Sequence, residues 1–192
     1  VHDLVSQKNI SKKDLLTKEF LIELKRDLLT FKRKGNPAIS THHINSEEND
    51  PTIKSLLAHG LDNKKDDNVK VILIPVYLEG NDGLINLQYY DAIAGCHLGV
   101  FPSYYEPWGY TPMEAIAMGV PSVTSDLAGF GRFVEDKISN TMDDGIFLLK
   151  RFKRNDEDVI KEFSQMLFDF SHRDKHLRAK NKISAKELSS TA

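Results

Sequence analysis

Five short apolar runs alternate with helix-like segments along this chain of 192 residues, and the alternation limits the fold more than any other feature. Residues 69–76 read Val-Lys-Val-Ile-Leu-Ile-Pro-Val, which is typical of a strand buried on both faces. Strands that alternate with helices at short spacing indicate a parallel sheet. We therefore predict an α/β fold with strands at residues 38–41, 69–76, 97–101, 120–124 and 145–149.

Helical patterns fill the intervals between these runs. Before residue 35, apolar side chains recur every three or four positions, which predicts an amphipathic helix. Asp50 followed by Pro51 indicates an N-cap and the first position of a second helix. Further helices are expected at residues 86–95, 112–118, 156–170 and 173–188.

Composition narrows the function classes. The net charge of −2 gives no electrostatic support for binding nucleic acid. Cys96 is the single cysteine, so it cannot form an internal disulfide, and it favours a reducing, cytoplasmic location. No apolar run reaches the roughly 18 residues that a membrane-spanning helix needs. We also find no spaced cluster of histidines and cysteines that would predict a metal site.

Residues 101–119 carry the strongest functional signal. Glu106 and Glu114 stand eight positions apart, with a glycine, a threonine and a proline that starts a helix between them. The stretch follows a predicted strand, and parallel sheets bind ligands beyond the carboxyl ends of their strands. A helix N-terminus offers free N–H groups and partial positive charge. The arrangement therefore favours a ligand in which a sugar is joined to phosphate.

Both acids also have a purely structural interpretation. Thr111 and Glu114 fit a capping box, with Thr111 as the N-cap and Pro112 in the first turn. In the functional interpretation Glu114 instead accepts hydrogen bonds from ribose hydroxyls. Glu106 is either a solvated loop acid or a ligand-binding group, and Trp108 is more typical of a packing residue.

Residues 95–136 resemble the glycogen synthases of animals, fungi and some bacteria. The resemblance is carried by residues 95–112, which read Gly-Cys-His-Leu-Gly-Val-Phe-Pro-Ser-Tyr-Tyr-Glu-Pro-Trp-Gly-Tyr-Thr-Pro. Weaker agreement continues through Gly129-Phe130-Gly131 and Glu135-Asp136. The resemblance implies a Rossmann-like parallel sheet flanked by helices, forming the C-terminal half of a GT-B glycosyltransferase with two domains.

The resemblance also implies a reaction and a set of roles. Glucose passes from UDP-glucose to the non-reducing end of an α-1,4-glucan, with retained configuration and without a metal or other cofactor. Glu106 is implied as the catalytic residue beside the transferred glucose. Tyr77 and Tyr89 frame the uracil, and Glu114 takes the ribose. The implied substrate-binding residues are Tyr77, Tyr89, Trp108, Gly109, Tyr110, Thr111 and Glu114.

On this basis we expect a helical lead-in at residues 1–36, a donor-binding domain at 37–150 and C-terminal helices at 151–192. The opposite, acceptor-binding domain has no counterpart in the chain, so we expect the chain alone to be inactive. Residues 172–182 are basic but contain only two arginines, Arg173 and Arg178. Eukaryotic members of the family that this chain resembles carry an arginine cluster there that binds the regulator glucose-6-phosphate. The stretch therefore predicts a non-regulated, bacterial-type member, or simply a solvated basic helix face.

Two other functions stay open at this point. One is a different retaining nucleotide-sugar transferase, such as a sucrose- or trehalose-synthase-like enzyme. The other is a non-catalytic module that binds a sugar nucleotide or a glucan. The expected partners are UDP-glucose and, through the other domain, the glucan, with neither nucleic acid nor membrane, and a homo-oligomer is left open.

Overall fold

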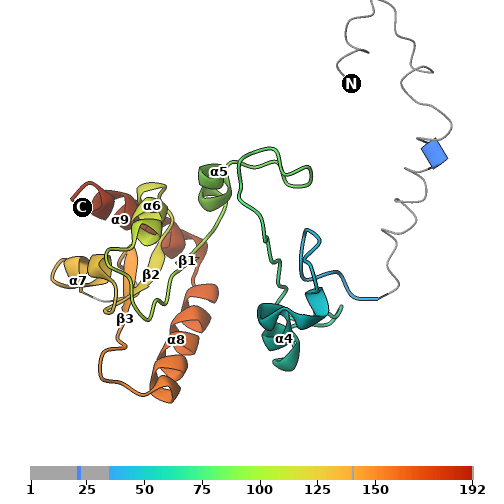
Figure 1. Cartoon of the computed structure of the whole chain (residues 1–192). Helices are drawn as coiled ribbons and strands as arrows, with labels where there is room; N and C mark the ends of the chain where they lie inside the picture. The colour runs from blue at the N-terminus through green and yellow to red at the C-terminus, as the bar shows by residue number, and fades with distance from the viewer. Residues whose placement is uncertain (1–20, 23–34, 140, 192) are drawn as a thin grey trace, which may run out of the picture. The chain divides into compact units, whose positions relative to one another are not determined.

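The computed structural model describes residues 21–22, 35–139 and 141–191 (Figure 1). The described residues fall into two compact units, with the boundary between Val76 and Tyr77. The predicted helix before residue 35 lies outside the described residues, apart from the helical pair Leu21 and Ile22. The predicted domain limits at residues 36 and 150 stay a prediction.

In the first unit, a 3₁₀ turn η1 (Glu47–Asn49) leads into helix α4 (Pro51–Ala58). The Asp50 carboxylate accepts hydrogen bonds from the N–H groups of Thr52 and Ile53, which otherwise have no partner inside the helix. Proline at the first helical position needs no N–H partner there. The helix predicted from Asp50 and Pro51 is confirmed.

The predicted strands at residues 38–41 and 69–76 are wrong within the described residues, because they share only one parallel bridge, Ser40 with Leu73. Val69 and Ile72 are 57% and 71% exposed, so the run is not buried on both faces. The side chain of buried Asn63 forms hydrogen bonds with the backbone of this run, as a neighbouring strand would do in a sheet. Its side-chain amide bonds the C=O and the N–H of Val71 at 2.9 and 2.7 Å. An apolar run forms a strand only where another strand completes its ladder.

The second unit is built on a three-stranded parallel sheet in the order β1-β2-β3. The strands are β1 (Gly99–Val100), β2 (Ser122–Ser125) and β3 (Ile146–Leu149), all at predicted positions. Ser122 pairs with Gly99 on one side and with Ile146 on the other, which makes β2 the central strand. These features confirm the predicted α/β class, a Rossmann-like parallel sheet flanked by helices.

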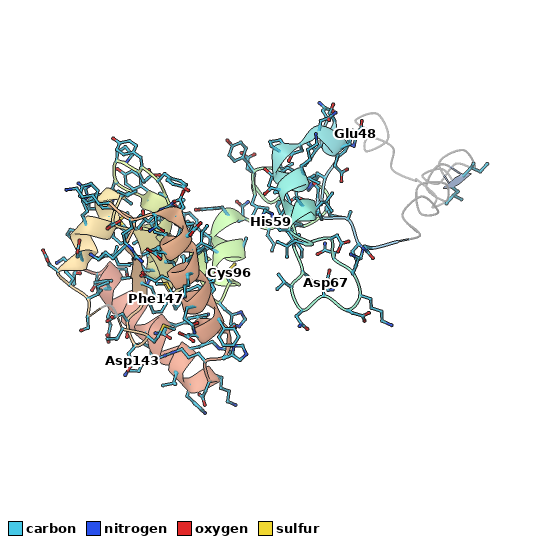
Figure 2. All side chains as sticks on the ribbon, turned by 90° about the horizontal axis from the view of Figure 1, so that it is seen from below. Glu48, His59, Asp67, Cys96, Asp143 and Phe147 are labelled. Atoms are coloured by element: carbon cyan, nitrogen blue, oxygen red, sulfur yellow. The ribbon has the colours of Figure 1, made fainter. Side chains whose placement is uncertain are left out.

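Alternate side chains of β3 enter two separate hydrophobic clusters, as the period of a strand requires. Ile146 joins a cluster with helices α6 (Tyr110–Ala117), α7 (Gly129–Glu135) and α9 (Lys175–Ser189). Phe147 and Leu149 join a second cluster with helix α8 (Asp156–Ser171). Phe147 is labelled in Figure 2, within the packed part of this unit. Helices therefore cover both faces of the sheet, as parallel strands need.

Four helix predictions agree with the structure to within a few residues: α5 (Tyr89–Ala94), α6, α8 and α9. Helix α7 was not predicted, because glycines such as Gly129 and Gly131 are more typical of turns than of helices. A Cβ at Gly131 would overlap the carbonyl oxygen of Ser125, so this glycine lets α7 lie directly against β2.

Candidate active site

The loop that follows β1 is attached to the loop that follows β2 close to Glu106. The N–H of Glu106 donates to the carbonyl of Leu127 at 3.3 Å, and the N–H of Gly129 donates to the carbonyl of Glu106 at 3.0 Å. Two residues later, the N–H of Phe130 donates to the carbonyl of Trp108 at 2.6 Å. The backbone of Glu106 is therefore bonded in both directions, at the carboxyl edge of the sheet where parallel folds bind ligands.

The Glu106 side chain is half-buried and, among the described residues, its carboxylate has no hydrogen-bond or ion-pair partner. It lies against the start of α6, because a Cβ added to Gly109 would meet its Cγ at 3.4 Å. The main chain thus fixes this residue while the carboxylate stays available to a ligand. That geometry suits an acid that contacts substrate.

Gly109 makes the turn into α6. It is buried and adopts φ 104° and ψ 72°, a conformation that side chains other than glycine rarely take. No side chain of a described residue caps the helix, which begins at Tyr110 rather than at Pro112. The capping-box interpretation is therefore wrong: Thr111 lies inside the first turn and is not the N-cap. The first N–H groups of a helix have no intrahelical partner, and Tyr110 and Thr111 are exposed.

Glu114 is held by two consecutive tyrosines from the start of α5. The hydroxyl of Tyr89 donates to Oε2 at 3.1 Å, and the hydroxyl of Tyr90 donates to Oε1 at 3.2 Å. Burial and the hydrogen bond to Glu114 raise the pKa of Tyr89. The same bond is the main reason that the pKa of Tyr90 is raised. Both tyrosines therefore keep their protons, and so donate, at neutral pH.

Tyr90 is the residue at this site that sequence reasoning missed. Its ring meets that of Tyr89 edge to face, with centroids 5.2 Å apart. Nothing in the local sequence separates it from a packing tyrosine. Only the approach of α5 to α6 shows that both hydroxyls reach the same carboxylate.

The remaining predicted residues divide into packed and exposed. Trp108 packs on Phe130 and Phe133, with ring centroids 5.8 and 5.6 Å away, as the packing interpretation expects. Tyr77 is 90% exposed. Among the described residues, no hydrogen bond or ring contact joins its side chain to Glu106 or Glu114. The structure thus brings together Glu106, Gly109 and the start of α6, and separately Glu114 and Tyr89.

Metal ligands do not gather in the described part of the chain, where no group of three or more His, Cys, Asp or Glu side chains could hold an ion. One Asp-x-Asp pattern occurs, at Asp156-Glu157-Asp158 in the first turn of α8. There Asp156 pairs with Arg151, and the N–H of Asp158 bonds the Asn155 cap. Within the same residues, no helix is both long and apolar enough to cross a bilayer.

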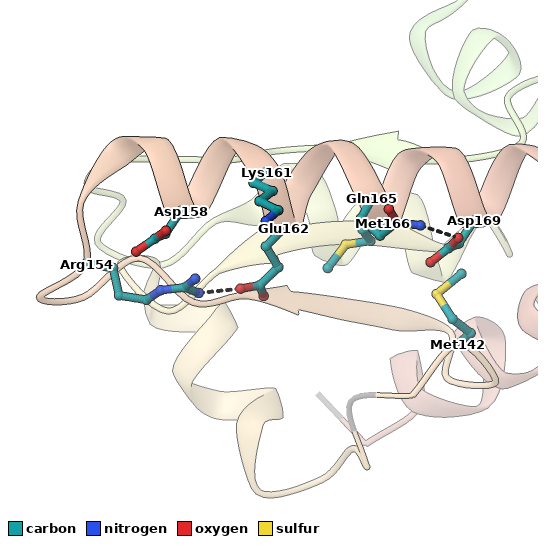
Figure 3. A pocket seen from close by; sticks show the side chains of 8 residues that line it. All are labelled: Met142, Arg154, Asp158, Lys161, Glu162, Gln165, Met166 and Asp169. Carbon is teal, nitrogen blue, oxygen red and sulfur yellow. Dashed lines mark hydrogen bonds and ion pairs between the residues drawn. The ribbon is translucent and has the colours of Figure 1, made fainter.

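A separate pocket of about 490 Å³ lies along α8 (Figure 3). Met142 and Met166 supply its apolar side, and an ion pair between Arg154 and Glu162 crosses one end. None of its lining residues belongs to the predicted site. The pocket is therefore not part of the candidate active site.

Comparison with known proteins adds independent information. The family model described as "Glycogen synthase" matches residues 1–191. The human liver glycogen [starch] synthase is 38% identical over 165 residues, covering 86% of this chain and 24% of the relative. The Neurospora crassa enzyme is 37% identical over 177 residues, covering 92% and 25%. The Caenorhabditis elegans enzyme is 42% identical over 149 residues, covering 78% and 22%. The chain thus spans about a quarter of the length of these relatives.

Proposed function

The chain belongs to the glycogen synthase family, and from this premise we propose that it is the donor-binding part of such an enzyme. In this proposal it binds UDP-glucose, and the full-length protein transfers glucose with retention to the non-reducing end of an α-1,4-glucan. In the same proposal, the glucan acceptor is bound by residues of the full-length protein that lie outside this chain. The chain alone is then inactive as a transferase.

One observation supports this function more than any other. Within the part of the chain that the structure describes, the Glu106 carboxylate has no partner and lies beside the N-terminus of α6, which no side chain caps, and a second carboxylate, Glu114, projects from the following turn. An uncapped helix N-terminus attracts phosphate, and a carboxylate accepts hydrogen bonds from sugar hydroxyls. A nucleotide diphosphate sugar carries a hexose, a diphosphate and a ribose in that order. The residues from Glu106 to Glu114 offer a group for each part in the same order.

In the reaction, the bond between the anomeric carbon of glucose and the phosphate oxygen breaks, and UDP leaves with the electron pair. The acceptor hydroxyl attacks the same face of the sugar, and its proton passes to the departing phosphate oxygen. Positive charge develops at the anomeric carbon, where the Glu106 carboxylate stabilises it. Negative charge develops on the diphosphate, where the N–H groups near Gly109, Tyr110 and Thr111 receive it.

The nucleoside is recognised further along α6. The Glu114 carboxylate accepts hydrogen bonds from the ribose hydroxyls. The Tyr89 ring stacks on uracil, while the Tyr89 hydroxyl holds the Glu114 carboxylate in place. The exposed Tyr77 supplies the second aromatic face. We further propose a cytoplasmic location, a reaction that needs no metal, and a bacterial-type enzyme that glucose-6-phosphate does not control.

Calorimetric titration of the full-length protein with UDP-, ADP- and GDP-glucose tests the donor assignment. We expect heat of binding from UDP-glucose and at least tenfold weaker binding of the purine donors, equivalent to about 1.4 kcal/mol. Tighter binding of ADP-glucose would move the protein to another donor class. No binding of any of the three, by a folded protein, would contradict the proposal.

A further inference from the structure

Two backbone carbonyls in the segment between β1 and Glu106 accept hydrogen bonds from side chains at the end of β2 and just after β3. The Arg151 guanidinium donates from Nη1 to the carbonyl of Pro102 at 2.6 Å. The buried hydroxyl of Ser125, the last residue of β2, donates to the carbonyl of Ser103 at 2.7 Å. Both bonds are made to backbone carbonyls, so they set the path of the chain toward Glu106.

Arg151 also contacts the next residue of this segment, Tyr104, by stacking on its aromatic ring. Its guanidinium carbon lies 3.5 Å from the centroid of the Tyr104 ring, close enough for a cation–π contact. The Tyr104 hydroxyl donates to Asp156 at 3.4 Å, and Nη2 of Arg151 pairs with the same carboxylate at 3.5 Å. Arg151, Tyr104 and Asp156 therefore each contact the other two, and Tyr104 lies two residues before Glu106.

The position of Arg151 is itself fixed from β2. Its backbone N–H donates to Oδ1 of Asp126 at 2.8 Å, and the N–H of Phe152 donates to the same atom at 3.2 Å. Arg151 lies two residues after β3; Asp126, the residue after β2, holds its main chain, and its side chain holds the loop after β1. One residue thus joins the carboxyl ends of all three strands.

Burial shows how fully this arginine is used. Its side chain is 8% exposed, whereas its partner Asp156 is 65% exposed. A buried guanidinium is tolerated only when its charge and donors are satisfied. The planar fork reaches a carbonyl and a carboxylate while its face covers a ring. Lysine, with a compact ammonium, cannot do all three.

We propose that Arg151 is a positioning residue: it holds residues 102–104 so that the Glu106 carboxylate stays beside the N-terminus of α6. It is not itself a catalytic residue, because its contacts are to the loop and to Asp156. The part of this inference that concerns catalysis rests on the proposed function. The part that concerns the loop does not.

Trp108 allows the loop to be tested on the chain itself, because it is the single tryptophan in the sequence and lies two residues after Glu106. We expect Arg151→Lys to red-shift its emission and to make it easier to quench with acrylamide, while circular dichroism stays unchanged. Arg154→Lys is the matched control, since the Arg154 guanidinium bonds the Lys150 carbonyl and Glu162 and, among the described residues, has no hydrogen bond or ion pair to residues 102–106. Unchanged Trp108 emission and quenching in Arg151→Lys would overturn the proposal.

Activity of the full-length protein gives the second readout. Misplacement of a reacting group by about 1 Å costs about 10²-fold in rate, so we expect Arg151→Lys to lower kcat by up to that factor. The KM for the donor should change little, because the hydrogen bonds that orient Glu114 come from Tyr89 and Tyr90 and not from residues 102–104. Arg154→Lys should change neither constant.

A double-mutant cycle completes the test. Tyr104→Leu removes the ring on which Arg151 stacks, so adding it to Arg151→Lys should lower kcat by less than the product of the two separate losses. Independent losses, or a rise in KM with kcat unchanged, would overturn the positioning role. If the unaltered protein shows neither donor binding nor transfer, the proposed function fails, while the Trp108 measurement still decides whether Arg151 fixes the loop.

Discussion

Glu106 and Glu114 are two carboxylates on the same short stretch that the structure fixes in opposite ways. The Glu106 main chain bonds Leu127 and Gly129, and its carboxylate has no partner among the described residues. The Glu114 carboxylate instead receives one tyrosine hydroxyl on each oxygen. An acid whose charge acts on a reacting atom benefits from an unpaired carboxylate on a fixed backbone. An acid that binds a hydroxyl group benefits from being oriented before the ligand arrives.

The largest effect is expected from removing the charge of Glu106. In full-length protein, Glu106→Gln should lower kcat by about 10²–10³-fold, since an uncharged amide stabilises positive charge poorly. Steady-state kinetics with saturating glucan measures the change. Glu187→Gln, on the exposed side of α9, is the control and should leave kcat unchanged. An equal loss in both variants would remove the special role of Glu106.

The next effect tests the backbone that holds Glu106. A Cβ at Gly129 would overlap the carbonyl of Pro107, so Gly129→Ala must push the Glu106 loop away from α7. We expect a loss of about 1–3 kcal/mol in the free energy of unfolding, together with lower kcat. At Gly95 the nearest atom to an added Cβ is 3.4 Å away, so Gly95→Ala should be nearly neutral. Urea denaturation compares the two, and similar losses would refute the packing argument.

A smaller effect is expected at the tyrosines that orient Glu114. Tyr90→Phe removes one hydroxyl and keeps the ring, so it should weaken donor binding by about two- to tenfold, the range of one hydrogen bond. Calorimetry measures this dissociation constant. The kcat should stay within error, because Glu106 is not touched. A fall in kcat at unchanged affinity would show that the two acids are not independent.

The smallest effect is a dependence on alkaline pH. The pKa of Tyr89 is raised above its ordinary value of about 10, so the folded state favours its neutral form. Its contribution to stability is complete below the unfolded pKa and is lost as pH rises through the folded pKa. Between pH 9 and 11, the Tm should therefore fall more in the unaltered chain than in Tyr89→Phe. Parallel curves for the two proteins would contradict this assignment.

The fold was predictable wherever local and long-range signals agreed. Residues 145–149 and 69–76 are both apolar runs, yet only the first forms a strand, because β2 completes its ladder and helices cover both faces. The backbone of residues 69–76 is instead hydrogen-bonded to Ile39, Thr41 and Asn63. The composition of a run predicts that it can form a strand. It does not predict whether a partner strand lies beside it in the fold.

The candidate site was predictable in its residues but not in its contacts. The spacing of Glu106, Gly109 and Glu114 indicated a loop followed by a helix, and the structure has this arrangement. The hydrogen bond from Tyr90 to Glu114 joins residues 24 positions apart, and the cation–π contact of Arg151 joins it to Tyr104 on a different loop. Contacts at such separations depend on how helices and strands pack. A single sequence does not display them.

The central claim is that Glu106 serves the reaction while Glu114 serves donor binding. Titration of UDP-glucose into full-length Glu106→Gln and Glu114→Gln, side by side, tests it most directly. We predict that the dissociation constant stays within about threefold in Glu106→Gln and rises at least about tenfold in Glu114→Gln, the loss expected for charge-assisted hydrogen bonds. Loss of donor affinity in Glu106→Gln with unchanged affinity in Glu114→Gln would contradict the account.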